Sequence, residues 1–509
     1  MITLKLDGRS LRLEDIENVA FGADIVVQLD EDAKVRMRES RALIEELVLA
    51  GEPVYGVTTG FGRLADVAIA PENREALQHN LVRSHASGMG DPLDSSAVRA
   101  LMLLRANALS RGHSGCRVEV VELLLGLLNA GIHPRVPEFG SVGASGDLAP
   151  LAHVALALLG EGRAEHEGVE SDVGPLMADA GLQPMRLGSK EGLALINGTQ
   201  ATTGIGILAL LAAERAVECA EVAGAMSMDA LLGTPEPFRQ EIQDARPHAG
   251  QGISAGRLRA LVAGSEIRES HREGDPRVQD AYSLRCMPQV HGAAREALRY
   301  IRGILETEAN SATDNPLVFP EAGVVVSGGN FHAQVVSAAL DLLAIALVDL
   351  ASISERRIER LLNPDLSMGL PAFLSKRPGL ESGFMIAQVT AVDLIGEMRV
   401  LSHPASVDSI TTSANQEDHV SMGLAAARKA LRVTRCVERV LATELMCAAE
   451  GIEYRRPLKS GAGVEKAHAT VRAVVDALDG DRMLGPDLDA LTELVRSGEM
   501  ARISKELEA

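Results

Sequence analysis

Four long stretches of helical pattern most constrain how this chain can fold. They cover residues 199–228, 287–309, 330–362 and 419–450, and each is longer than an ordinary globular helix. From residue 338 to 362, apolar side chains recur at helical spacing, and the pattern stops at Asn363 and Pro364. Because helices of this length bury their apolar faces against one another, the sequence predicts a bundle of long helices.

The composition favours a mainly α chain and narrows its partners. Aromatic residues make up only 2% of the 509, and the apolar residues are mostly Ala, Leu, Val and Ile in runs with Glu and Arg. A net charge of −20 argues against a nucleic-acid surface. The five cysteines form no CxxC and the thirteen histidines no HExxH, so we expect reduced thiols and no metal site.

The sequence also indicates a cytoplasmic protein without a membrane segment. The first residues contain no apolar leader, so we expect no signal peptide. No uncharged run reaches the length of a membrane span, and charged residues interrupt the best candidate, residues 205–226.

Shorter elements precede the long helices. We expect a strand in the first residues, helices near 13–16 and at 33–50, 72–84, 95–111 and 117–130, and a small β-containing excursion at 160–190. The pattern changes after Asn197 and Gly198. We therefore expect an N-terminal domain of residues 1–205, followed by a long-helix bundle and C-terminal helical region of residues 206–509.

The segment of residues 140–150, with sequence GSVGASGDLAP, contains a tripeptide that can react with itself. Gly146 has no Cβ, so its nitrogen can approach the carbonyl carbon of Ala144. Closure with loss of water gives a five-membered ring, and loss of the Ser145 hydroxyl as a second water leaves an exocyclic methylene, a strong electrophile. The alternative is a turn that starts a helix, with Ser145 or Asp147 as its N-cap.

Other segments rich in Gly, Pro and polar residues also interrupt the helices, and loops on a rigid scaffold often carry function. They cover residues 55–62, 84–88, 195–200, 279–285, 310–316, 327–332 and 409–419. Taken alone, their residues have ordinary interpretations: Tyr55 as a packed loop aromatic, Asn197 as a helix cap and Arg285 as a surface ion-pair partner. Residues 56–62 lack the Lys and the strand–helix context of a phosphate loop.

Together, these segments resemble the ammonia-lyase family that carries the methylidene-imidazolone (MIO) group, and most nearly its histidine-specific members. The resemblance extends from residues 55–62 to residues 413–423, SANQEDHVSMG. It implies a mainly α fold of fumarase/aspartase-like architecture, with an MIO-bearing N-terminal domain followed by a long central helix bundle. It also implies a homotetramer whose active sites draw residues from three subunits, and no cofactor beyond the MIO ring.

The resemblance implies a role for each candidate residue. Ala144, Ser145 and Gly146 would form the ring, with Asp147 close to the cyclising backbone. Tyr55 would be the general base on a mobile loop, Arg285 would bind the substrate carboxylate, and Glu417 would hydrogen-bond the substrate imidazole or exchange a proton with it. The amino-acid pocket would be lined by His85, Asn197, Gln279, Tyr282 and Phe331.

The implied reaction is the non-oxidative removal of ammonia from L-histidine to give trans-urocanate, in histidine degradation. Members acting on phenylalanine or tyrosine typically have Phe-Leu or His-Leu where this chain has Ser84 and His85, and Gln in place of Glu417. The alternatives are a tyrosine or phenylalanine ammonia-lyase, an aminomutase of the same family and, more distantly, a non-catalytic helical oligomer. Whether the ring would react with the substrate amine, which we favour, or with its imidazole stays open.

Overall fold

The fold divides into two compact units. The computed structural model describes residues 2–506 except 23, 53 and 65, with the side chain of residue 63 also left out. Unit 1 comprises Met1–Leu211, Arg302–Asp341 and Pro404–Arg428, and unit 2 comprises Ala212–Ile301, Leu342–His403 and Lys429–Ala509. The expected domain boundary near residue 205 stays a prediction.

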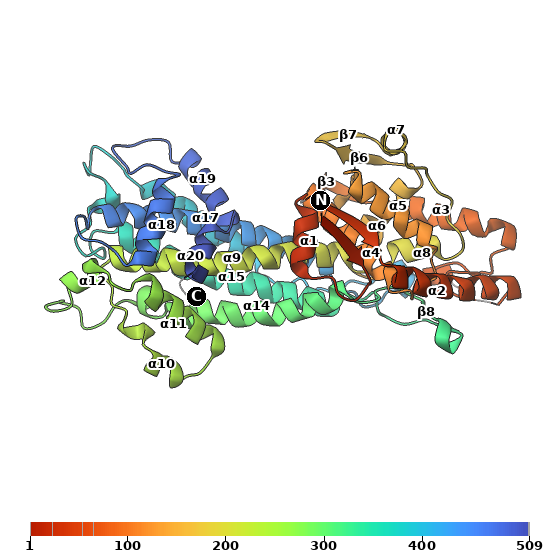
Figure 1. Cartoon of the computed structure of the whole chain (residues 1–509), viewed down its shortest axis with the longest axis horizontal. Coiled ribbons are helices and arrows are strands. Elements are labelled where there is room, and N and C mark those ends of the chain that lie inside the picture. Colours follow the sequence, from red (N-terminus) through yellow and green to blue (C-terminus); the bar gives the residue numbers. More distant parts are fainter. Residues whose placement is uncertain (1, 23, 53, 65, 507–509) are drawn as a thin grey trace. The chain divides into compact units, whose positions relative to one another are not determined.

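The four predicted long helices are present, and the mainly α fold is confirmed. They are α9 (Gln200–Ala230), α14 (Met287–Ala309), α15 (Gln334–Leu362) and α17 (Gly423–Glu453), drawn in Figure 1. Their bounds lie within a few residues of the predicted ones, because the apolar periodicity of each continues to its end.

The helix most similar to a membrane span is α15, not the segment that the sequence indicated. Within the described part of the chain it is the one helix long and apolar enough to cross a membrane by length and composition, whereas the sequence pointed to residues 205–226 as the best candidate. It meets this test because most of its charged residues lie between residues 355 and 360, near its C-terminal end. Of its most apolar window, 56% is buried within the chain.

Unit 1 is built around α4. The unit begins with the parallel strands β1 (Ile2–Leu6) and β2 (Ile25–Leu29), which are connected through α1 (Leu13–Ala20). The next helices are α2 (Glu31–Ala50), α3 (Arg74–His85), α4 (Ser95–Ser110) and α5 (Val118–Asn129). Since 13 of the 16 residues of α4 are buried, and α4 packs against α1, α2 and α5, it lies in the core of this unit.

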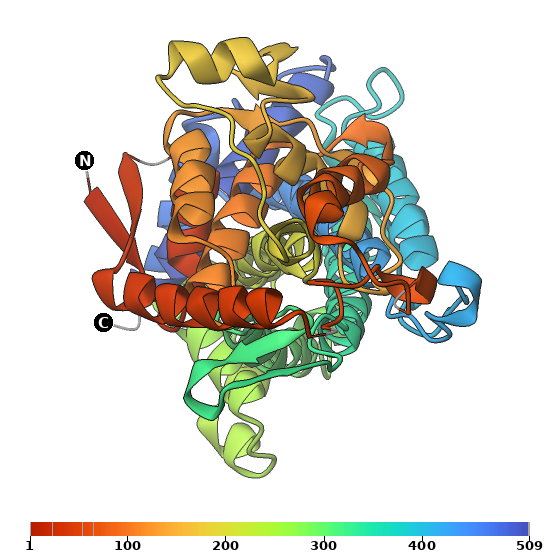
Figure 2. The same ribbon diagram turned by 90° about the vertical axis from the view of Figure 1, so that its right-hand side faces the viewer.

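Short elements complete unit 1. Strand β3 (Met89–Pro92) pairs antiparallel with β5 (Pro137–Phe139), and β4 (His133–Pro134), β6 (Arg163–His166) and β7 (Val169–Asp172) form a second sheet. This second sheet contains the predicted β excursion. The remaining helices are α6 (Leu148–Leu158), α7 (Val173–Asp179) and α8 (Glu191–Ile196). The hairpin of β8 (Leu317–Phe319) and β9 (Val324–Val326) lies beside α2 (Figure 2).

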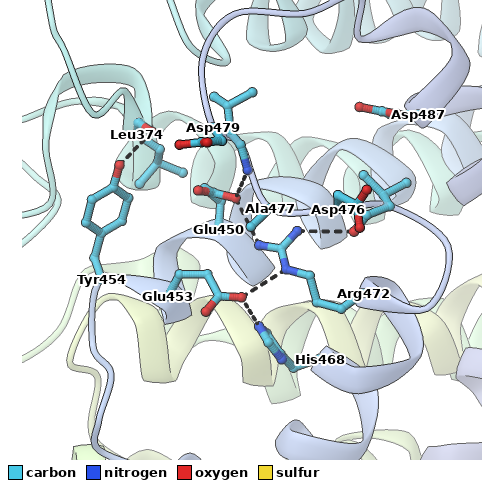
Figure 3. A network of polar contacts seen from close by, with 12 residues as sticks. Leu374, Glu450, Glu453, Tyr454, His468, Arg472, Asp476, Ala477, Asp479 and Asp487 are labelled. Atoms are coloured by element: carbon cyan, nitrogen blue, oxygen red, sulfur yellow. Dashed lines mark hydrogen bonds and ion pairs between the residues drawn. The ribbon is translucent and has the colours of Figure 1, made fainter.

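Unit 2 contains shorter helices, and a polar network connects one of them to a long helix. They are α10 (Gln240–Asp244), α11 (Ala249–Leu261), α12 (Glu266–Ser270), α13 (Tyr282–Arg285), α16 (Met385–Leu401), α18 (Ala462–Arg472), α19 (Gly485–Arg496) and α20 (Glu499–Glu506). In Figure 3, Arg472 of α18 donates to Glu450 (2.9 Å) and Glu453 (3.0 Å) of α17. His468 contacts the same oxygen of Glu453 at 2.9 Å, so the network connects α18 to the end of α17.

Candidate active site

The tripeptide Ala144–Gly146 lies where two helices begin. Helix α6 starts at Leu148, and Asp147 occupies its N-cap position without a capping side-chain hydrogen bond. Gly146 forms a bridge with Gly198, two residues before α9. The turn-and-helix interpretation is therefore right about the local structure. The two helix N-termini also place partial positive charge beside the tripeptide, which favours negative charge there.

The backbone around the tripeptide is held closely on both sides. Gly146 has φ +81°, and a Cβ at this position would lie 2.2 Å from the carbonyl oxygen of Gly198. The amide of Asp147 donates to that oxygen at 2.6 Å. On the other side, the Ser421 hydroxyl donates to the carbonyl of Gly143 at 3.2 Å. Only glycine satisfies the conformation and the space at residue 146, and the same property lets its nitrogen close a ring.

Asp147 lies buried directly behind the tripeptide. Its carboxylate accepts hydrogen bonds from the amide (2.7 Å) and hydroxyl (2.9 Å) of Thr202 and from the hydroxyl of Ser141 (3.1 Å). Burial raises the pKa of Asp147, and the hydrogen bonds from Thr202 and Ser141 oppose that rise. A buried acid that can carry a proton therefore lies beside the backbone expected to cyclise.

A cavity of about 630 Å³ in unit 1 opens onto Ser145. Its walls are mainly apolar, with a few convergent polar groups, as is usual for small-molecule sites. The apolar lining includes Phe61, Leu64, Val67, Ile69, Leu77, Leu81, Leu148, Leu193 and Ile196. Five of the predicted site residues also line it: Tyr55, His85, Ser145, Asn197 and Glu417.

Glu417 faces Ser145 across this cavity. The Ser145 hydroxyl donates to Oε1 of Glu417 at 2.9 Å. The hydroxyls of Thr412 and Ser413 donate to Oε2 at 2.7 and 2.8 Å. Three hydroxyl donors thus fix the orientation of the carboxylate.

The Tyr55 hydroxyl has a donor on its oxygen. The amide of Gly62 donates to it at 3.0 Å, and the Tyr55 ring packs edge-to-face against Phe61 with centroids 6.5 Å apart. A backbone N–H at this oxygen stabilises negative charge on it. The contacts suit a residue that accepts a proton from a ligand.

His85 is a neutral acceptor in this site. Its Nδ1 lies 2.9 Å from the carbonyl oxygen of Leu81. A carbonyl only accepts, so Nδ1 carries the hydrogen and Nε2 is left as an acceptor. Burial lowers the pKa of His85, although the hydrogen bond to Leu81 and the charge of Glu417 oppose the change, and this shift favours the uncharged ring.

Asn197 presents an unused acceptor. Its amide nitrogen donates to the carbonyl of Asn315 at 3.1 Å, which fixes which end of the amide carries oxygen. The buried Oδ1 has no hydrogen-bond partner within the described residues. Because Asn197 lines the cavity, this oxygen is suited to accept a hydrogen bond from a ligand.

Four other predicted residues lie outside that cavity. Gln279, Tyr282 and Arg285 line a separate cavity of about 390 Å³ in unit 2, where the Arg285 guanidinium stacks over the Tyr282 ring at 4.5 Å. Tyr282 is 70% exposed. Phe331, in unit 1, is half-buried and is not among the described residues that line the first cavity.

The sequence profile of the aromatic amino acid lyase family matches residues 11–473. The chain belongs to this family. A histidine ammonia-lyase from Myxococcus xanthus is 52% identical over 495 residues, which cover 97% of each chain. The solved histidine ammonia-lyase of Trypanosoma cruzi matches with a TM-score of 0.93 at 45% identity, covering 99% of this chain and 96% of that one. A tyrosine aminomutase from Streptomyces globisporus also has a TM-score of 0.93, at 37% identity and 99% coverage of both chains.

Sequence reasoning missed several residues that position the site of this lyase. Thr202 and Ser141 hold Asp147, and Thr412 holds Glu417, but a single hydroxyl residue in a loop or a first helical turn carries no distinctive signal. Arg105 falls within the helix predicted at 95–111, and the helical pattern alone gives its side chain no partner. An arginine on an apolar helix face was the available signal, since such a residue needs buried partners.

Proposed function

We propose that this chain is a histidine ammonia-lyase, a carbon–nitrogen lyase that converts L-histidine to trans-urocanate and ammonia. The observation that carries the proposal is the contact between Ser145 and Glu417 inside a cavity that also presents Tyr55, His85 and Asn197. A carboxylate at this place can accept a hydrogen bond from an imidazole N–H, whereas a phenyl ring offers it no donor. The names of the relatives at about half identity support the same substrate.

The electrophile would form from the chain itself. The nitrogen of Gly146 bonds to the carbonyl carbon of Ala144. That carbonyl oxygen leaves as water with the amide hydrogens of Ser145 and Gly146. The hydroxyl and the Cα hydrogen of Ser145 leave as a second water. The close-held glycine and the buried Asp147 fit this closure. When formed, the ring supplies an electrophile for the substrate amine, which makes ammonia a better leaving group.

Ring closure changes the surroundings of Glu417. Before closure, Oε1 accepts from the Ser145 hydroxyl, and Oε2 is occupied by Thr412 and Ser413. Loss of the Ser145 hydroxyl removes the donor to Oε1 and leaves Oε2 held. The freed oxygen is then available to the imidazole N–H of histidine. Ring closure itself would therefore prepare Glu417 to bind the imidazole.

Tyr55 and Asn197 would handle the reacting end of the substrate. Tyr55 takes the β-proton, and the amide of Gly62 holds its oxygen in place and stabilises the charge. The unpartnered Oδ1 of Asn197 accepts from the substrate amine. Because both groups line the same cavity, proton removal and ammonia departure can occur on a single bound substrate.

We further propose a cytoplasmic homotetramer in which other copies complete the site. Gln279, Tyr282, Arg285 and Phe331 lie outside the first cavity of this chain. Arg285 would pair with the substrate carboxylate through its planar guanidinium. No cation is among the described residues that line this cavity, and Arg285, together with the exposed Tyr282 of another copy, would supply one for that carboxylate.

Two of the alternative functions belong to the same family. A tyrosine or phenylalanine ammonia-lyase, or an aminomutase, would use the same tripeptide. The structural similarity to a tyrosine aminomutase is the observation that favours them as alternatives. They release different products, so product analysis separates them. A non-catalytic helical oligomer would give no product from any of these amino acids.

The test is to incubate purified protein with L-histidine and to follow the near-ultraviolet absorbance of urocanate, with Ser145→Ala as the matched variant. We expect product with the wild type, none with the variant, and an intact mass lower by two waters in the wild type alone. A wild-type mass with no water lost would overturn the proposal, and product only from tyrosine or phenylalanine would replace the substrate.

A further inference from the structure

Arg105 is a fully buried cation whose role the reaction does not explain. It lies on α4 within unit 1 and is 1% exposed. Burial lowers the pKa of its guanidinium, and the charge of Asp314 opposes the change. The carboxylate of Asp314 is itself paired with Lys190 at 2.9 Å. Arg105 therefore has no carboxylate of its own among the residues described, although burial of an unpaired charge is costly.

The guanidinium binds neutral oxygens of the segment that carries Asn197. Nη1 donates to the carbonyl of Asn197 (2.8 Å) and to the side-chain oxygen of Gln200 (2.9 Å), and Nη2 donates to the carbonyl of Ala194. Nη1 also lies 3.4 Å from the carbonyl of Thr313, whose hydroxyl accepts from Gln200 at 2.6 Å. The Arg105 side chain thus connects the end of α8, the start of α9 and the segment at residue 313, which lies between α14 and β8.

This connection reaches the ring-forming tripeptide through Gly198. A Cβ on Gly198 would lie 2.4 Å from Nη1 of Arg105, so the guanidinium packs directly against this residue. The other side of Gly198 is bridged to Gly146, and its carbonyl accepts from Asp147 at 2.6 Å. Gly198 is therefore fixed between Arg105 and the backbone that has to close.

We propose that Arg105 is a positioning residue for ring maturation: it holds the peptide of Asn197 and Gly198 as the template against which Gly146 closes onto Ala144. The inference rests on the proposed function, because it concerns the same ring. Closure joins the Gly146 nitrogen to the Ala144 carbon and releases two waters, with no oxidant or reductant. A rigid template matters because a displacement of about 1 Å is enough to misalign reacting atoms.

The test compares Arg105→Lys with Arg99→Lys in the full-length protein. Arg99 is a matched control because it lies on the same helix and also donates to a backbone carbonyl, that of Val19 at 2.7 Å. Lysine keeps the charge but cannot reach several oxygens from one planar group. We expect most Arg105→Lys chains to have the intact mass of the unclosed tripeptide, with neither water lost. Their kcat should be lowered about 100-fold, and their KM for histidine should be nearly unchanged. The Arg99→Lys chains should lose both waters, as the wild type does.

The outcomes separate the inference from the proposed function. If the wild type shows neither water loss nor urocanate, the proposed function falls first. If the wild type shows both, complete water loss with wild-type kcat in Arg105→Lys overturns the role of Arg105. A purely structural role would lower the melting temperature of both variants and leave their ring content equal to that of the wild type.

A second variant keeps the test valid if Arg105→Lys does not fold. Gln200→Met removes one acceptor of Arg105 and the donor to Thr313 while the guanidinium stays. We expect a mixed population in which some chains retain both waters, with kcat lowered in proportion to the fraction that lacks the ring. Full water loss and wild-type kcat in this variant would contradict the proposal.

Discussion

Replacing Glu417 by Gln exchanges one carboxylate oxygen for an amide nitrogen and leaves the size of the side chain almost unchanged. The hydroxyls of Thr412 and Ser413, at 2.7 and 2.8 Å, donate to one end of the group. We expect the amide oxygen to stay with these two donors. The NH₂ group then faces Ser145 and the cavity, where the proposed substrate also presents an N–H.

The magnitude follows from the single contact that is lost. A hydrogen bond to a charged group contributes about 1.5–3 kcal/mol, and each 1.4 kcal/mol is a factor of ten. Loss of the contact between Oε1 and the imidazole should therefore lower kcat/KM for histidine about 10- to 100-fold. The ring should still form, because no step of its closure uses Glu417.

Urocanate formation under initial-rate conditions measures the effect, together with intact mass for the ring. Asp418→Asn is the matched control, since it removes the same charge from the neighbouring exposed residue. A Glu417→Gln protein with the ring intact and kcat/KM within twofold of the wild type would refute the assignment of Glu417 to the imidazole. A loss of the ring in this variant would show instead that Glu417 acts during maturation.

Three other changes test separate parts of the structure. Tyr55→Phe should lower kcat about 100- to 10,000-fold with the two-water mass loss unchanged, and near-normal turnover would exclude Tyr55 as the base. Gly146→Ala, at φ +81° and with its Cβ 2.2 Å from the carbonyl oxygen of Gly198, should abolish ring formation and lower the melting temperature; a ringed, fully stable variant would contradict this. Asp229 is buried, and burial raises its pKa from 3.8 to about 6, so the folded state binds this proton more tightly and loses stability as the pH rises from about 4 to 6. Asp229→Asn should therefore raise the free energy of unfolding at pH 7 by at most roughly 3 kcal/mol, and hardly change it at pH 4. Melting temperatures at the two pH values measure the effect, and an equal change at both would contradict the shift.

The long helices and the reactive tripeptide were accessible to sequence reasoning because both depend on local chemistry. Helical spacing of apolar residues located α9 and α14 to within two residues at each end. The capacity of Gly146 to close on Ala144 belongs to three consecutive residues and needs no knowledge of the fold. The start of α6 after Asp147 also follows from local preference.

The tertiary structure decided which distant residues share a surface. Ser145 and Glu417 are 272 positions apart in the chain, and only packing places their oxygens 2.9 Å apart. It also showed that Tyr282 and Arg285 lie outside the cavity that contains Tyr55. Sequence similarity nominates these residues together, whereas the folded chain places them in two separate cavities.

Arg105 shows where sequence reasoning stops for a physical reason. By periodicity alone it is one position on the buried face of a helix, beside Leu101 and Leu109. Its role depends on four acceptor oxygens, on residues 194, 197, 200 and 313. These oxygens lie within hydrogen-bond distance of Arg105 only when α4, α8 and α9 pack together. Periodicity and composition report which face is buried, whereas the partners of a buried charge depend on long-range contacts, and those exist only in the folded chain.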